Sequence, residues 1–164
     1  MPRMSGAKFM VQMMQAYGVT HAFYMPMVVT QALVEMEKVG IRRIMTHGEK
    51  AAAYMADGYA RAAHRAGICM AQNVGAANLA AGLQDAYLAG SPVIAITGRA
   101  TPMQLYRHHY QEIDHVPPFA AVTKYNVLVD SAAQLPLLLR QAFRGPRRAR
   151  PGRSIWTCKA PQVT

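Results

Sequence analysis

The chain has 164 residues, of which 52% are hydrophobic, and this length and composition favour one folded domain with a substantial core over a disordered chain. Its formal net charge is +10, but no zinc-finger, helix-turn-helix or aromatic stacking pattern accompanies the arginine-rich last quarter, so a nucleic-acid partner is not expected. No apolar run reaches the roughly 18 residues of a membrane-spanning helix, and no signal-peptide pattern is present, so we expect a cytoplasmic protein without a membrane partner.

Segments typical of helices and strands alternate along the chain. Apolar residues at helical spacing, with Ser5 before the first segment and Gly18 after it, predict helices over 5–17, 30–39, 49–64, 79–88 and 131–144. Short apolar runs predict strands over 21–25, 41–46, 67–72, 92–97, 123–129 and 154–158. Six short strands separated by helices indicate an α/β fold, a three-layer αβα arrangement around a mostly parallel sheet.

Cysteines and histidines predict no metal site in this chain. Cys69 and Cys158 lie far apart in apolar runs, where reduced, buried thiols are expected in the cytoplasm. The six histidines have none of the spacings that metal sites use.

Four segments follow directly after expected strands, namely residues 26–27, 47–49, 73–78 and 98–112. Ligands of parallel sheets bind at the carboxyl ends of the strands, so we expect these four segments to share one rim.

Glu49 occupies the first turn of the helix expected over 49–64. The helix dipole stabilises an ionised carboxylate there by about 0.3–1 kcal/mol, so a capping role alone explains this acid. The helix is also unusually rich in small residues, which would let a second backbone or a flat ligand approach closely. These small residues are Ala51, Ala52, Ala53, Ala56, Gly58, Ala60, Ala62 and Ala63.

The order and spacing of several motifs resemble the N-terminal pyrimidine-binding domain of thiamine diphosphate-dependent enzymes, in the acetolactate synthase and 2-oxo acid decarboxylase group. The motifs lie at residues 18–23, 46–61, 75–79, 86–98, 110–114 and 122–125. The resemblance implies a thiamine diphosphate-binding fold, with residues 1–164 as a single domain. It also implies that the middle and diphosphate-binding domains of the longer enzymes are absent from this chain.

The resemblance implies a chemical role for Glu49. In the family this acid hydrogen-bonds N1′ of the cofactor's aminopyrimidine ring from a water-poor pocket and thereby activates the cofactor. Gln111 matches a second catalytic position, a glutamine near the reacting carbon, although a surface-loop amide is an alternative. The neighbouring pair His108 and His109 invites comparison with the paired histidines of some decarboxylases, which would give it a proton-transfer role. The surrounding residues instead resemble the synthase-like Phe-Gln-Glu pattern, with Tyr110 in place of the phenylalanine.

The resemblance also implies cofactor contacts from Pro26, Met27, Gly75 and Asn78. Gly75 is most simply interpreted as a turn glycine that permits a positive φ. Asn78 is interpreted as a residue that holds its turn through backbone hydrogen bonds.

The implied cofactor is thiamine diphosphate, with Mg²⁺ held by a diphosphate-binding domain or subunit rather than by this chain. That partner, assembly into a homo- or hetero-oligomer, and a 2-oxo acid substrate are all expected, and the chain alone should be inactive. Met25 and Met27 depart from the family's pattern after the first strand, and Lys159 stands where an acid is usual. These departures leave an alternative, a degenerate pyrimidine domain that acts only in protein interaction.

Overall fold

The computed structural model describes residues 4–26, 30–101 and 103–144, together with the backbone of residues 154–159. The helices are α1 (Gly6–Ala16), α2 (Thr30–Lys38), α3 (Glu49–Ala63), α4 (Gly75–Leu88), α5 (Val116–Ala120) and α6 (Leu135–Arg144), with a 3₁₀ turn η1 (Ala132–Gln134). The strands are β1 (His21–Tyr24), β2 (Arg42–Met45), β3 (Gly67–Gln72), β4 (Val93–Arg99), β5 (Tyr125–Val129) and β6 (Ser154–Lys159).

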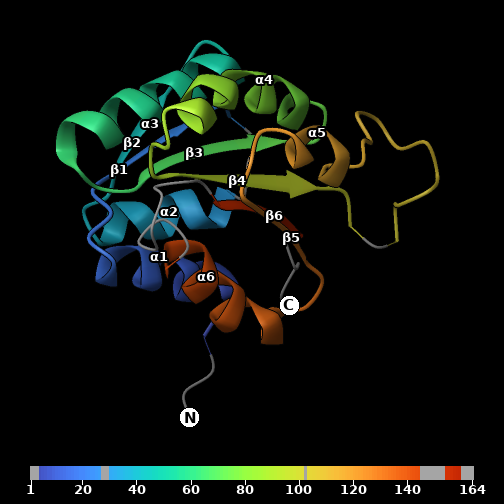
Figure 1. The fold of residues 1–164 in the computed structure, drawn as a ribbon. Coiled ribbons are helices and arrows are strands. Elements are labelled where there is room, and N and C mark those ends of the chain that lie inside the picture. Colours follow the sequence, from blue (N-terminus) through green and yellow to red (C-terminus); the bar gives the residue numbers. More distant parts are fainter. Residues whose placement is uncertain (1–3, 27–29, 102, 145–153, 160–164) are drawn as a thin grey trace.

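The six strands form one sheet in the order β2-β1-β3-β4-β6-β5, and all five pairings are parallel. Helices α1, α2 and α6 cover one face of the sheet, and α3, α4 and α5 cover the other (Figure 1). The α/β class and the three-layer αβα arrangement predicted from the sequence are thus confirmed.

The central strands β3 and β4 alternate large and small side chains between the two faces. Their large residues pack toward α1, α2 and α6, and these are Ile68, Met70, Ile94 and Ile96. Their smaller residues pack toward α3 and α4, and these are Cys69, Ala71, Val93 and Ala95. Small side chains on that face let α3 and α4 lie close to the sheet. Cys69 is buried as expected, whereas the side chain of Cys158 on β6 lies outside the described residues.

The first helix begins and ends where its capping signals predict. Ser5 adopts an extended conformation, and its hydroxyl oxygen accepts a hydrogen bond of 3.2 Å from the backbone N–H of Lys8. Gly18, after the C-cap residue Tyr17, has a φ of +78°, a conformation that glycine adopts readily.

Several elements differ from the sequence-based expectation. Helix α4 begins at Gly75 rather than at residue 79, because Asn73 takes a left-handed φ of 41° and turns the chain directly after β3. Strand β4 continues to Arg99, since it pairs with β3 on one side and β6 on the other. A short helix that the sequence analysis did not predict, α5, follows β4, and its Phe119 is fully buried.

Candidate functional site

The described parts of the four segments expected to share a rim lie at the carboxyl ends of β2, β1, β3 and β4, which are neighbours in the sheet, and the last segment begins within β4 itself. Two backbone hydrogen bonds continue the sheet into this rim. The N–H of Thr46 donates to the carbonyl of Tyr24 at 2.9 Å, and the N–H of Asn73 donates to the carbonyl of Gly98 at 2.8 Å. The rim is therefore a continuation of the sheet, which holds its segments at defined positions.

Glu49 is the first residue of α3 and is half-buried. The N-cap, Gly48, is extended and has no side chain with which to cap the helix. Its carbonyl accepts a hydrogen bond of 2.9 Å from the hydroxyl of Thr46, which fixes the turn that leads into α3. The carboxylate therefore stands at the positive end of the helix dipole, directly after a turn that Thr46 fixes.

Asn78 and Gly75 on α4 lie against the Glu49 carboxylate. The side-chain amide of Asn78 donates to Glu49 Oε2 at 3.3 Å. A Cβ added at Gly75 would overlap Glu49 Oε1 and would come within 2.9 Å of Cδ. Gly75 is fully buried and is not among the glycines with positive φ, so the need for glycine comes from this close approach rather than from a turn conformation. The side chain of Asn78 thus contacts the acid, a contact that the expected backbone role did not include.

The close approach of α4 to α3 depends on small residues along both helices. A Cβ added at Gly82 would lie 2.8 Å from the carbonyl oxygen of Lys50 and 2.8 Å from Ala53 Cβ. Ala53 and Ala56 are fully buried in the same cluster. The small residues predicted to admit a second backbone therefore admit α4 of the same chain, and this packing brings Asn78 to Glu49.

The other predicted site residues that the structure describes, Pro26 and Gln111, are not hydrogen-bonded to this cluster. Pro26 is exposed in the turn after β1, and Met27 lies outside the described residues. Gln111 is half-buried in the loop between β4 and α5, with a left-handed φ of 62°. Within the described ranges, no hydrogen bond links Pro26 or Gln111 to Glu49. The structure thus brings together Glu49, Gly75 and Asn78.

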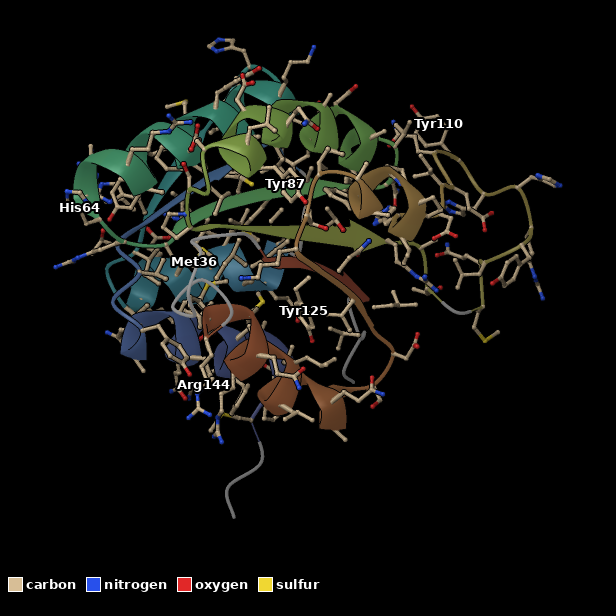
Figure 2. The ribbon with its side chains drawn as sticks, in the orientation of Figure 1. Met36, His64, Tyr87, Tyr110, Tyr125 and Arg144 are labelled. Carbon is tan, nitrogen blue, oxygen red and sulfur yellow. The ribbon has the colours of Figure 1, made fainter. Side chains whose placement is uncertain are left out.

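The loop that carries Gln111 projects beyond the carboxyl end of β4, where Tyr110 is labelled in Figure 2. Gln111 lines a shallow hollow of about 370 Å³ together with Tyr106, His108, His109 and Glu112. All of its lining residues belong to this loop.

The two neighbouring histidines of this loop have different surroundings. Both ring nitrogens of His109 are engaged, with Nε2 3.1 Å from the side-chain nitrogen of Gln104 and Nδ1 3.0 Å from the carbonyl of Tyr110. A neutral ring protonated at Nδ1 satisfies both contacts. His108 is exposed. The geometry therefore gives His109 a structural role in the loop and does not pair the two rings.

Sequence analysis missed His115, which is only 1% exposed. Its Nδ1 is 3.0 Å from the hydroxyl of Thr97, and its Nε2 has no partner of hydrogen-bond geometry among the described residues. Burial, reinforced by the charge of Arg99, lowers the pKa of His115 to about 4, while Asp114 and the backbone of Asn73 act in the opposite direction. A single histidine in a polar stretch gives no sequence signal for this burial.

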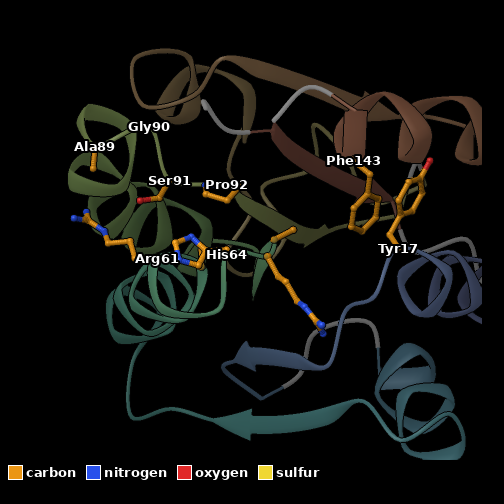
Figure 3. Close-up of a pocket in the computed structure, with 11 residues that line it drawn as sticks. Tyr17, Arg61, His64, Ala89, Gly90, Ser91, Pro92 and Phe143 are labelled. Carbon is orange, nitrogen blue, oxygen red and sulfur yellow. The ribbon is translucent and has the colours of Figure 1, made fainter. Parts of the chain in front are cut away.

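A larger hollow, of about 540 Å³, lies at the amino ends of the strands, the end of the sheet opposite to the rim (Figure 3). It is lined partly by His64, at the end of α3, and by Pro92, just before β4. Tyr17 and Phe143 form its aromatic wall, with ring centroids 4.4 Å apart and nearly parallel planes. This position at the amino ends of the strands separates it from Glu49.

The described part of the chain contains no helix long and apolar enough to cross a membrane. It also contains no group of three or more His, Cys, Asp or Glu side chains placed to hold a metal ion.

Comparison with known proteins assigns the family. The family described as thiamine pyrophosphate enzyme, N-terminal TPP binding domain, matches residues 4–117. The chain is 36% identical to the probable acetolactate synthase large subunit of Methanocaldococcus jannaschii over 154 residues, which cover 91% of this chain and 26% of that protein. It is 37% identical to the acetolactate synthase isozyme 2 large subunit of Escherichia coli K12 over 154 residues, which cover 91% of this chain and 28% of that protein.

A plant relative gives the same result. The chain is 35% identical to acetolactate synthase 2, chloroplastic, of Nicotiana tabacum over 152 residues, which cover 90% of this chain and 23% of that protein. The chain thus spans about a quarter of the length of the curated relatives it matches. The protein belongs to the thiamine pyrophosphate enzyme family and corresponds to its N-terminal TPP-binding domain.

Proposed function

We propose that this chain supplies Glu49 to a thiamine diphosphate site, where the carboxyl group hydrogen-bonds N1′ of the cofactor's aminopyrimidine ring and activates the cofactor. The observation that carries the proposal is the half-buried Glu49 carboxylate at the start of α3, held by the Asn78 amide and closely packed against Gly75. This carboxyl group suits an aminopyrimidine, because a carboxyl group can share a proton with a ring nitrogen.

Each residue of the cluster has a distinct task in this proposal. Asn78 holds Glu49 Oε2 and thereby orients the carboxyl group that would meet the ring nitrogen. Gly75 leaves room for the carboxylate beside α4. Gln111 presents its amide from the neighbouring loop toward the reacting carbon. When bound, the cofactor stabilises the carbanion that forms after decarboxylation of a 2-oxo acid.

We further propose that a diphosphate-binding domain or subunit completes the site and holds the diphosphate and Mg²⁺. Two observations support a requirement for a partner. The relatives are about four times as long as the matched region, and they are named large subunits of acetolactate synthase in M. jannaschii and E. coli. A 2-oxo acid substrate and loss of activity in the isolated chain follow from the same proposal.

An exposed apolar surface on α3 and α4 is the proposed contact with a second subunit. Tyr54 and Met55 on α3 are 45% and 43% exposed, and Tyr87 on α4, labelled in Figure 2, is 40% exposed. The Asp85 carboxylate of α4 raises the pKa of Tyr54, so the exposed side of α3 lies next to α4 at this point. Exposed aromatic residues of this kind are typical of protein interfaces.

The proposal is tested by calorimetric titration of the chain with thiamine diphosphate and Mg²⁺, alone and mixed with a diphosphate-binding domain protein. We expect the cofactor to bind in the mixture. Glu49→Gln should abolish both cofactor binding and turnover of 2-oxo acids. The matched control is Glu35→Gln, which makes the same change at an ion pair with Lys38 on α2. Near-normal turnover in Glu49→Gln would refute the role of this acid. Absence of binding in every mixture would favour a degenerate domain that acts in protein interaction.

A further inference from the structure

Three residues of the loop between β4 and α5 adopt left-handed backbone conformations that are unusual for residues other than glycine. The φ angles are 63° at Tyr106, 52° at His108 and 62° at Gln111. Such conformations are unfavourable for L side chains and persist only where the surroundings impose them. Some group in this loop must therefore hold the backbone in place.

Glu112 is that group. Its Oε1 accepts a hydrogen bond of 2.6 Å from the backbone N–H of Tyr106, and its Oε2 accepts one of 3.0 Å from the backbone N–H of His109. The N–H of Glu112 in turn donates to the carbonyl of His109 at 2.9 Å. One carboxylate thus closes the loop on itself with charge-assisted hydrogen bonds, which are stronger than those between neutral groups.

The charge of Glu112 is favoured by the same contacts. The hydrogen bond from Tyr106, with further contributions from the backbones of His109 and Arg107, lowers the pKa of Glu112 against the opposing effect of burial. The carboxylate therefore remains ionised and bound to the loop at neutral pH.

Gln111 lies in the sequence between His109, whose N–H is bound by the Glu112 carboxylate, and Glu112 itself. It precedes Glu112, follows the segment that Glu112 holds, and lines the same hollow as Tyr106 and His109. We propose that Glu112 is a positioning residue, which fixes the loop and thereby the direction in which Gln111 presents its amide to the substrate. This inference rests on the proposed function, in which Gln111 lies near the reacting carbon.

The first test needs only the chain itself. In ¹H–¹⁵N NMR spectra, the Tyr106 and His109 amide protons should lie downfield because they donate to a carboxylate. Glu112→Ala should move both and broaden the signals of residues 104–112, while the rest of the spectrum shows that the fold persists. Asp114→Asn is the matched control, because Asp114 accepts a comparable hydrogen bond from the N–H of Val116, the first residue of α5, and within the described part of the chain makes no hydrogen bond to residues 104–112. Unchanged loop signals in Glu112→Ala would overturn the inference.

The second test uses the complex reconstituted with a diphosphate-binding domain protein. Glu112→Ala should lower kcat/KM for the 2-oxo acid by about 10- to 100-fold, the effect of a small misplacement of a substrate-contacting group. The Kd for thiamine diphosphate should change by less than about twofold, because the Glu49 cluster is untouched. Glu112→Gln should recover part of the loss, since its amide oxygen can still accept one N–H.

A double-mutant cycle separates positioning from any independent role. If Glu112 acts through Gln111, adding Glu112→Ala to Gln111→Ala should cost little further activity. Multiplicative losses in the double variant would overturn the inference, as would full activity of Glu112→Ala in a complex that Glu49→Gln inactivates. Activity retained in Glu49→Gln would instead refute the proposed function.

Discussion

The side-chain amide of Asn78 on α4 donates a hydrogen bond of 3.3 Å to Glu49 Oε2 on α3, across 29 residues of sequence. The contact joins the only acid in the first turn of α3 to a residue one turn into the next helix. It exists because Gly75 and Gly82 let the two helices approach closely. The position of the Glu49 carboxylate is therefore a property of the α3–α4 pair rather than of α3 alone.

Replacing Asn78 by Ala should weaken binding of thiamine diphosphate to the reconstituted complex by about 10- to 100-fold. Hydrogen bonds to charged groups contribute about 1.5–3 kcal/mol, and here the bond orients the carboxylate. Asn78→Asp should weaken binding further, because a second carboxylate would repel Glu49. Calorimetry measures both Kd values, with Gln84→Ala on the exposed side of α4 as control. An unchanged Kd in both variants would contradict this role of Asn78.

Gly75→Ala should displace the Glu49 side chain, since the new methyl group would occupy the place of its carboxylate. We expect loss of cofactor binding together with destabilisation by about 1–3 kcal/mol, the usual effect of overpacking. Calorimetry and urea unfolding measure the two effects separately. Wild-type affinity in a folded Gly75→Ala variant would show that Glu49 does not depend on this contact.

Gly82→Ala should destabilise the fold by about 1–3 kcal/mol, because the added Cβ would press on Lys50 and Ala53 of α3. Gly58→Ala is the matched control on α3, where an added Cβ meets nothing within 4 Å. That control should stabilise the protein by about 0.5–1 kcal/mol, as expected for alanine in a helix interior. Urea unfolding of the two variants should therefore give shifts of opposite sign, and equal shifts would argue against close helix packing at Gly82.

Stability should depend on pH through His115. Its pKa is lowered from 6.5 to about 4 in the folded protein, so the unfolded chain binds its proton more tightly. The stabilising effect of the neutral ring is therefore fully present above pH 6.5 and is lost as pH falls toward 4. A shift of this size corresponds to about 3 kcal/mol.

Urea unfolding between pH 4 and pH 7 tests this dependence in His115→Gln. The variant should lose part of the slope seen in the wild type, because its side chain does not titrate. His64→Gln, at an exposed position after α3, should retain the wild-type slope. Identical slopes in all three proteins would show that His115 does not carry the effect.

Local sequence patterns predicted the elements of the fold. Ser5 and Gly18 marked the ends of α1, and continuous apolar runs marked the buried strands β3 and β4. These signals succeed because capping, turn conformation and strand burial depend on a few neighbouring residues. The same alternation placed residues 47–49 and 73–78 at the carboxyl edge of a parallel sheet, since parallel strands end together.

What each side chain does at that edge was decided by tertiary structure. Gly75 is required by the carboxylate of Glu49 rather than by its own φ, and Glu112 closes a loop that composition marks only as polar. The burial of His115 has no local signature either. The sequence by itself determined the family, the order of elements and the position of Glu49 at a helix start. Only the packed structure decided its partners, because the distance between α3 and α4 depends on every side chain between them.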